Sequence, residues 1–239
     1  MDNVAAFLRY LASEKNYSAH TVRAYSKDIE GFAMHCSDAY SLHNLSKVHY
    51  PMLRDYIIVL SKRGLTMRSI NRKCSALKSL YAYFQKIGII EVHPFAQHKA
   101  VKAKKAFITP FSVAELNTVL EQIDRSDFAG LRDATAIELL YGTGIRQAEL
   151  IGLKTSDIDW AQGQMRVLGK RNKERLIPII PALATTLKHY VTQRKNWPGT
   201  SVHSFLLVTN KGNKTYPAFV YRLIKTYFRS VSNLSLIHI

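Results

Sequence analysis

The sequence has few cysteines and no long hydrophobic run, and each shortage excludes a class of protein. Cys36 and Cys74 are the only cysteines, and both fall on the apolar side of an expected helix. We therefore predict reduced core side chains, with neither a disulfide framework nor a metal site. No segment approaches roughly 18 continuous apolar residues, and the N-terminus has no basic region followed by an apolar one, so we expect a soluble, cytoplasmic protein without a membrane span.

Acidic residues are also scarce, since 34 Lys and Arg face only 17 Asp and Glu, a formal net charge of +17 over 239 residues. Residues 1–110 hold 17 basic and 7 acidic side chains, and residues 111–239 hold 17 and 10, giving +10 and +7. A basic excess in both parts favours a polyanionic partner that both parts contact. Nucleic acid is favoured over a membrane as that partner. The alternative is a charge that serves solubility alone.

Residues 1–88 predict four helices, because apolar side chains recur there at spacings of three and four. Ser18 and Thr66 stand where caps are expected, and Pro51 opens the third helix. The fourth helix turns a polar face outward, formed by Arg68, Arg72, Ser75 and Ser79. Such a face suits a DNA backbone, with the arginines neutralising phosphates and the hydroxyls donating to them, although an ordinary solvated face has the same composition.

Residues 89–110 form a basic stretch with little apolar periodicity, which predicts an interdomain linker. Its lysines could follow a phosphate backbone or simply be solvated: Lys99, Lys102, Lys104 and Lys105. A second domain, 111–239, opens with a capping box at Ser112 and Glu115. Further helices follow, with three short β-rich runs between residues 158 and 179 that predict a meander. The fold class we expect is mainly α with a small β-meander.

The stretch 141–152 carries the strongest functional signal. Gly142 and Gly144 are expected to end one helix, and Arg146 then lies in the first turn of the next. Free N–H groups at a helix start attract anions, and a guanidinium adds a planar donor fork for phosphate oxygens. Glu149 lies on the same face and can hold Arg146. An arginine that merely pairs with Glu149 on a solvated helix is the alternative.

Thr143, Gly144, Arg146, Glu149, Leu150 and Leu153 spell Thr-Gly-x-Arg-x-x-Glu-Leu-x-x-Leu. This resembles the first arginine box of the tyrosine recombinases, the phage-integrase-like family, Xer type. The run from Leu168 to Pro178 looks like that family's β-hairpin with its catalytic lysine, Lys170, followed by Arg171 where the family often has glycine.

The resemblance implies an N-terminal helical, SAM-like core-binding bundle at 1–88 and an α+β catalytic domain that is incomplete at its C-terminus. Arg146 would bind phosphate oxygens, Lys170 would protonate the leaving 5′ oxygen, and Glu149 would hold the arginine. Arg171 and Lys173 would contact DNA beside them. Double-stranded DNA and a tetramer of protomers are the implied partners, and no metal or nucleotide cofactor is called for.

The same pattern requires a His-x-x-Arg box and a nucleophilic tyrosine that we expect downstream of about residue 232. Tyr216, Tyr221 and Tyr227 precede that place and are better explained by packing. Residues 234–239 resemble translated sequencing adapter and are expected to be foreign. We therefore expect a recombinase fragment unable to cleave DNA. One alternative is a short DNA-binding protein that competes for recombination sites; a helical nucleic-acid module unrelated to recombination is another.

Overall fold

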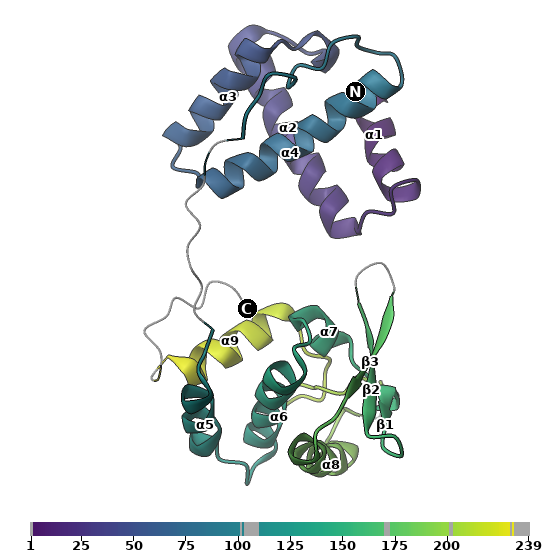
Figure 1. The fold of residues 1–239 in the computed structure, drawn as a ribbon, viewed down its shortest axis with the longest axis vertical. Helices are drawn as coiled ribbons and strands as arrows, with labels where there is room; N and C mark the ends of the chain where they lie inside the picture. Colours follow the sequence, from purple (N-terminus) through teal and green to yellow (C-terminus); the bar gives the residue numbers. More distant parts are fainter. Residues whose placement is uncertain are drawn as a thin grey trace. The chain divides into compact units, whose positions relative to one another are not determined.

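The computed structural model describes residues 2–100, 102, 110–169, 173–200, 203–229 and 231. The chain divides into two compact units, Met1–Ala106 and Phe107–Ile239 (Figure 1). Each unit has its own hydrophobic core, so each is described by itself.

The first unit is a helical bundle, as the sequence predicts. Its helices are α1 (Asp2–Ser13), α2 (Ala19–Tyr40), α3 (Tyr50–Lys62) and α4 (Met67–Lys86), with the short 3-10 helix η1 (Leu45–Lys47) before α3. The predicted caps are present: the side chain of Ser18 accepts a hydrogen bond from the backbone of Thr21, and that of Thr66 accepts one from Ser69. Each cap satisfies a backbone N–H that the helix itself leaves unpaired.

Aromatic and aliphatic side chains from all four helices fill the core of the first unit, among them Phe7, Phe32, Ile70, Tyr81 and Phe84. Cys36 and Cys74 lie in the same core as free thiols, which confirms the predicted role of both cysteines. Burial disfavours the thiolate and raises the pKa of Cys36 to about 11.

The first part of the predicted linker packs on this bundle. Phe95 is only 4% exposed, and its ring lies 6.2 Å from that of Tyr81 between centroids. Ile89 and Ile90 pack against the same core. Residues 89–98 therefore pack as part of the first unit, because an aromatic ring laid against α4 buries apolar surface on both partners. Lys99 and Lys102 are exposed, and Lys104 and Lys105 fall outside the described residues.

The second unit is built around α6 (Phe128–Thr143), which is buried on most of its circumference. Around it lie α5 (Val113–Gln122), α7 (Gln147–Gly152), α8 (Pro181–Lys195) and α9 (Pro217–Phe228), and Figure 1 shows the sheet at one side of these helices. The predicted capping box is present, since Ser112 accepts from the backbone of Glu115 while the Glu115 carboxylate accepts from Ser112. Helices α6, α9 and strand β2 all contact α7.

The predicted meander is a three-stranded antiparallel sheet in the order β1 (Ile158–Asp159), β2 (Gln164–Leu168), β3 (Glu174–Pro178), preceded by the 3-10 helix η2 (Thr155–Asp157). Met165 pairs with Ile177 and Val167 with Arg175. Met165 and Val167 are buried, so their partners on β3, Ile177 and Arg175, lie on the same inward face of the sheet. Among the described residues, 205–208 make only isolated bridges and no strand. The fold class predicted from the sequence is confirmed.

Candidate nucleic-acid interface

A left-handed turn delivers Arg146 to the start of α7. Helix α6 runs to Thr143, and Gly144 follows at φ 61°, with its N–H donating to the carbonyl of Leu140. Glycine enters this region without the steric cost that other residues bear, so Gly144 ends the helix as predicted. The prediction for Gly142 is wrong: it lies inside α6, because the left-handed turn that ends the helix comes at Gly144 and not at Gly142. Arg146 is the N-cap residue of α7, one position before the predicted first turn.

A buried carboxylate holds Arg146 by both its backbone and its side chain. The backbone N–H of Arg146 donates to Oε2 of Glu149 at 2.8 Å, and Nη1 donates to Oε1 at 2.9 Å. The side chain of Arg146 is 70% exposed, whereas that of Glu149 is 5% exposed. The arginine therefore presents its charge to solvent while the buried carboxylate of Glu149 fixes its position.

Glu149 has a second cationic partner, Arg175 on β3, which the sequence did not single out. Nη1 and Nη2 of Arg175 donate to the two carboxylate oxygens at 2.9 and 2.7 Å. These hydrogen bonds, more than those of Arg146, lower the pKa of Glu149 to about 2. The alternation of side chains along β3 could have identified Arg175 in the sequence. Arg175 lies on the same inward face as Ile177, and an arginine on that face needs a partner for its charge.

Gly169 closes the hairpin beside this pair. Its N–H donates to the carbonyl of Lys173 at 2.8 Å. Lys173 is exposed, as a DNA contact would require. Lys170 and Arg171, which follow Gly169 directly, fall outside the described residues.

On α4, the two predicted DNA-binding arginines differ. Arg68 is exposed. Arg72 is half exposed and forms a bidentate pair with the buried Asp28 of α2, to which Lys73 also donates at 2.9 Å. The serine hydroxyls of the same face, Ser75 and Ser79, donate to backbone carbonyls one turn earlier, at 2.9 and 3.0 Å, because a serine within a helix reaches that carbonyl readily. Their contact with phosphates stays a prediction.

The three tyrosines discussed from the sequence lie on or next to α9. Tyr227 packs against the second core and donates to Asp133 at 3.2 Å, and burial raises its pKa to about 12. Tyr216 accepts from Arg222 at 2.6 Å, and Tyr216 and Tyr221 are 45% and 41% exposed. A phenol whose pKa is raised is a poorer nucleophile at neutral pH, which agrees with a packing role for Tyr227.

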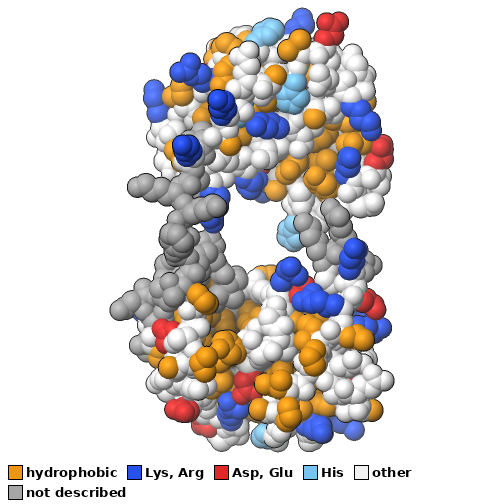
Figure 2. Space-filling model, in the orientation of Figure 1, with side chains coloured by type: hydrophobic (Ala, Val, Ile, Leu, Met, Phe, Trp, Pro, Cys, Tyr) orange, Lys and Arg blue, Asp and Glu red, His pale blue; other side chains and the backbone are white. Residues whose placement is uncertain are grey.

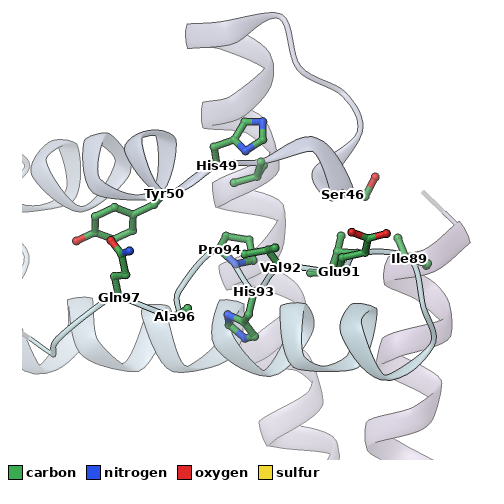
Figure 3. Close-up of a pocket in the computed structure, with 12 residues that line it drawn as sticks. Ser46, His49, Tyr50, Ile89, Glu91, Val92, His93, Pro94, Ala96 and Gln97 are labelled. Atoms are coloured by element: carbon green, nitrogen blue, oxygen red, sulfur yellow. The ribbon is translucent and has the colours of Figure 1, made fainter.

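The first unit also holds a cavity of about 580 Å³ between the start of α3 and residues 89–97 (Figure 3). The polar side chains that line it are His49, Tyr50, Glu91, His93 and Gln97. Both ring nitrogens of His93 already form hydrogen bonds, one with the carbonyl of Lys78 and one with the N–H of Phe95, so neither is free for a ligand.

Within the described part of the chain, no group of three or more His, Cys, Asp or Glu could hold a metal ion. No described helix is long and apolar enough to cross a membrane.

Residues 106–236 match the Phage integrase family, and residues 4–86 match the Phage integrase N-terminal SAM-like domain. Tyrosine recombinase XerC of Staphylococcus saprophyticus is 32% identical over 235 residues, which cover 98% of this chain and 78% of that protein. The XerC of Staphylococcus haemolyticus is 34% identical over 208 residues, or 86% and 68% of the two chains.

Solved structures share the fold at lower identity. The Tn1549 transposon integrase in complex with transposon right end DNA gives a TM-score of 0.77 at 18% identity, covering 98% of this chain and 80% of that one. A lambda integrase tetramer bound to a Holliday junction gives 0.72 at 19% identity, covering 98% and 64%.

The chain therefore belongs to the phage integrase family of tyrosine recombinases. Within that family it is of the Xer type, and the function it shares with its relatives is site-specific DNA recombination.

Proposed function

We propose that the chain binds duplex DNA during site-specific recombination in the bacterial cytoplasm, as one protomer of a tetramer on DNA. In this proposal Arg146 contacts the phosphodiester at which strands are exchanged. Lys170 acts as general acid toward the departing 5′ oxygen, and Glu149 holds Arg146 in place.

One observation carries the proposal: Arg146 is a solvent-exposed cation fixed by a buried carboxylate. Attack on a phosphodiester develops extra negative charge on the phosphate oxygens. A donor fork that is already oriented stabilises that charge better than water, which must reorient. Most of the Arg146 side chain is open to a ligand, while the carboxylate that holds it is buried.

The covalent step is the one the family uses. A tyrosine phenolate attacks phosphorus, the bond to the 5′ oxygen breaks, and a 3′-phosphotyrosine and a 5′-hydroxyl result. Tyr227 is not proposed as the nucleophile because it packs against the core and its pKa is raised. Tyr216 and Tyr221 are not proposed because they precede the place where the family's pattern puts the nucleophile. Lys170 supplies the proton to the 5′ oxygen, which leaves as a hydroxyl group.

Basic side chains of both units make the remaining contacts in this proposal, mostly with phosphates. These are Arg68, Arg72, Lys99, Lys102, Lys104, Lys105, Arg171 and Lys173. On the face shown in Figure 2, Lys and Arg side chains are spread over both units and acidic side chains are sparser. Phosphate contacts of this kind give affinity that falls steeply with salt and orient the protein on the duplex without reading sequence.

The test compares Arg146→Ala with Arg166→Ala on a short duplex selected from a randomised pool by the wild-type chain. Arg166 is a fair control because it is also an exposed arginine of the second unit that pairs with a carboxylate, Asp157. Among the single phosphates that are ethylated, one should weaken DNA binding by the wild type when it is modified but should not change binding by Arg146→Ala. Arg166→Ala should keep the wild-type pattern. If the two variants give the same pattern, Arg146 does not bind the phosphate.

A second measurement asks whether this chain forms the covalent intermediate by itself. The chain is incubated with nicked versions of the same duplex, and covalent protein–DNA adducts are sought on denaturing gels. Binding without an adduct agrees with the expectation that none of Tyr216, Tyr221 and Tyr227 is the nucleophile. An adduct that is lost in Arg146→Ala would overturn that expectation and would support a catalytic role for Arg146.

A further inference from the structure

We propose that Arg175 is a positioning residue for Arg146, acting through Glu149, and that it ties the β2–β3 hairpin to the turn before α7. The proposal rests on the proposed function for the role of Arg146 itself. Arg175 need not touch DNA; its task is to keep the carboxylate in the one orientation that aims Arg146 outward.

The hydrogen bonds at Glu149 fill the carboxylate. Oε1 accepts from Nη1 of Arg146 and Nη1 of Arg175, and Oε2 accepts from the backbone N–H of Arg146 and Nη2 of Arg175. A carboxylate offers about four lone-pair sites, so all are used. Rotation of the carboxylate by even a fraction of a turn would break bonds to both arginines. Arg175 contributes half of these bonds and the only bidentate pair.

The two arginines are held to different degrees. Arg175 uses both terminal nitrogens on Glu149 and its side chain is 37% exposed. Arg146 places only Nη1 on Glu149 and is 70% exposed. Two guanidinium groups around one carboxylate leave a net charge of +1, carried outward by the more exposed side chain. Without Arg175, Glu149 would be held only by the residue it is meant to hold, and Arg146 could exchange its single side-chain bond for water.

The end of β2 is shaped to leave room for Arg175. A Cβ placed on Gly169 would lie 3.1 Å from Nη1 of Arg175, 3.3 Å from the carbonyl oxygen of Lys173 and 3.5 Å from Oε1 of Glu149. A side chain there would press on the Arg175–Glu149 pair and on the hairpin backbone together. Because Lys170 follows Gly169 in the sequence, this contact links the strand that leads to the proposed general acid with the proposed phosphate-binding arginine.

A double-mutant cycle on DNA affinity tests the inference with Arg175→Gln, Arg146→Ala and the double variant. We expect Arg175→Gln to weaken binding about tenfold in the wild-type background, the size of a charge-assisted hydrogen bond. In the Arg146→Ala background it should change binding by less than about twofold, because Arg175 acts through Arg146. Arg175→Lys should fall between wild type and Arg175→Gln, since lysine keeps the charge but not the bidentate fork.

Arg166→Gln is the matched control, since it removes a cation from the neighbouring strand that does not touch Glu149. Equal losses from Arg175→Gln in both backgrounds would mean that Arg175 binds DNA directly, and would overturn the inference. So would an unchanged affinity in the wild-type background. If Arg146→Ala itself has no effect, the proposed function fails instead, and the two failures are thereby distinguished.

A second readout does not depend on DNA. The carboxyl carbon of Glu149 is followed by NMR as pH is lowered, in the wild type and in Arg175→Gln. The wild-type pKa is expected near 2, and loss of Arg175, its main cause, should raise it toward the ordinary value of 4.5. Arg175→Lys should give a value between the two. If Arg175→Gln leaves this pKa unchanged while tryptophan fluorescence shows a folded second unit, Arg175 does not control the carboxylate.

Discussion

Arg175 and Glu149, 26 residues apart in the sequence, meet through two parallel hydrogen bonds of 2.9 and 2.7 Å. The first unit repeats the arrangement: the buried carboxylate of Asp28 receives both Arg72 and Lys73 of α4. In a chain with a net charge of +17, two of the few carboxylates are thus buried beneath basic side chains. Each fixes a pair of cations whose mutual repulsion would otherwise spread them apart.

Replacing Glu149 with glutamine should destabilise the second unit by about 3 kcal/mol, because two guanidinium groups then share no counter-charge. The chain's only tryptophans, Trp160 and Trp197, both lie in this unit, so their fluorescence during urea unfolding reports on it alone. Glu174→Gln is the control, since that side chain is 58% exposed and lies 4.0 Å from Arg166; its expected change is under about 0.5 kcal/mol. Equal losses from both variants would contradict the role assigned to Glu149.

The stability of the second unit should fall as pH drops below the ordinary range of a glutamate. The folded-state pKa of Glu149 is about 2 against a usual 4.5, so its contribution is complete above about pH 4.5 and is lost as pH falls toward 2. A shift of this size corresponds to on the order of 3 kcal/mol. Urea midpoints from tryptophan fluorescence at several pH values should therefore converge for wild type and Glu149→Gln at the acid end. Curves that stay parallel would show that Glu149 titrates normally.

Asp28→Asn should destabilise the first unit by about 2 kcal/mol, since it removes the counter-charge shared by Arg72 and Lys73 at a buried position. The only two cysteines lie in this unit and are buried, so their reaction with an aromatic disulfide reagent in increasing urea follows its unfolding. Asp38→Asn, an exposed position on the same helix, should leave the transition in place. A shift of the tryptophan transition along with the thiol one would show that the two units do not unfold independently.

Arg68→Ala should lower the slope of log affinity against log salt by about one, as expected when one phosphate contact is lost. The reason is that Arg68 lies exposed on the face of α4 assigned to DNA. Arg9→Ala, an exposed arginine on α1, serves as control and should leave the slope nearly unchanged. If both variants reduce the slope equally, the net charge of the first unit attracts DNA without a preferred face.

Local signals in the sequence were enough for the helices and the meander. Apolar spacing, the caps at Ser18, Thr66 and Ser112, and short β-rich runs each act within a few residues, where sequence reading is strongest. Arg146 and Glu149 were found because they lie three residues apart on one helix end. The fold class followed from the same patterns.

What the sequence did not reveal depends on contacts between distant segments. The partners Asp28 and Arg72 are 44 residues apart, and Glu149 and Arg175 are 26 apart, so nothing local marks either pair. Phe95 lies in a stretch without helical or strand periodicity, and its burial depends on the surface of α4 that it covers. Gly142 and Gly144 look equivalent in the sequence, and only the left-handed turn at Gly144 distinguishes them.

The pairing of Val167 with Arg175 limits how this hairpin can evolve. Successive residues of a strand point to opposite faces, so inserting or deleting one residue between Gly169 and Lys173 could turn Arg175 outward and bring its exposed neighbour, Leu176, to the inner face. Substitutions in that loop would leave the register intact. We therefore expect homologous chains to keep the parity of this loop's length, and an engineered hairpin to tolerate insertions of two residues better than of one.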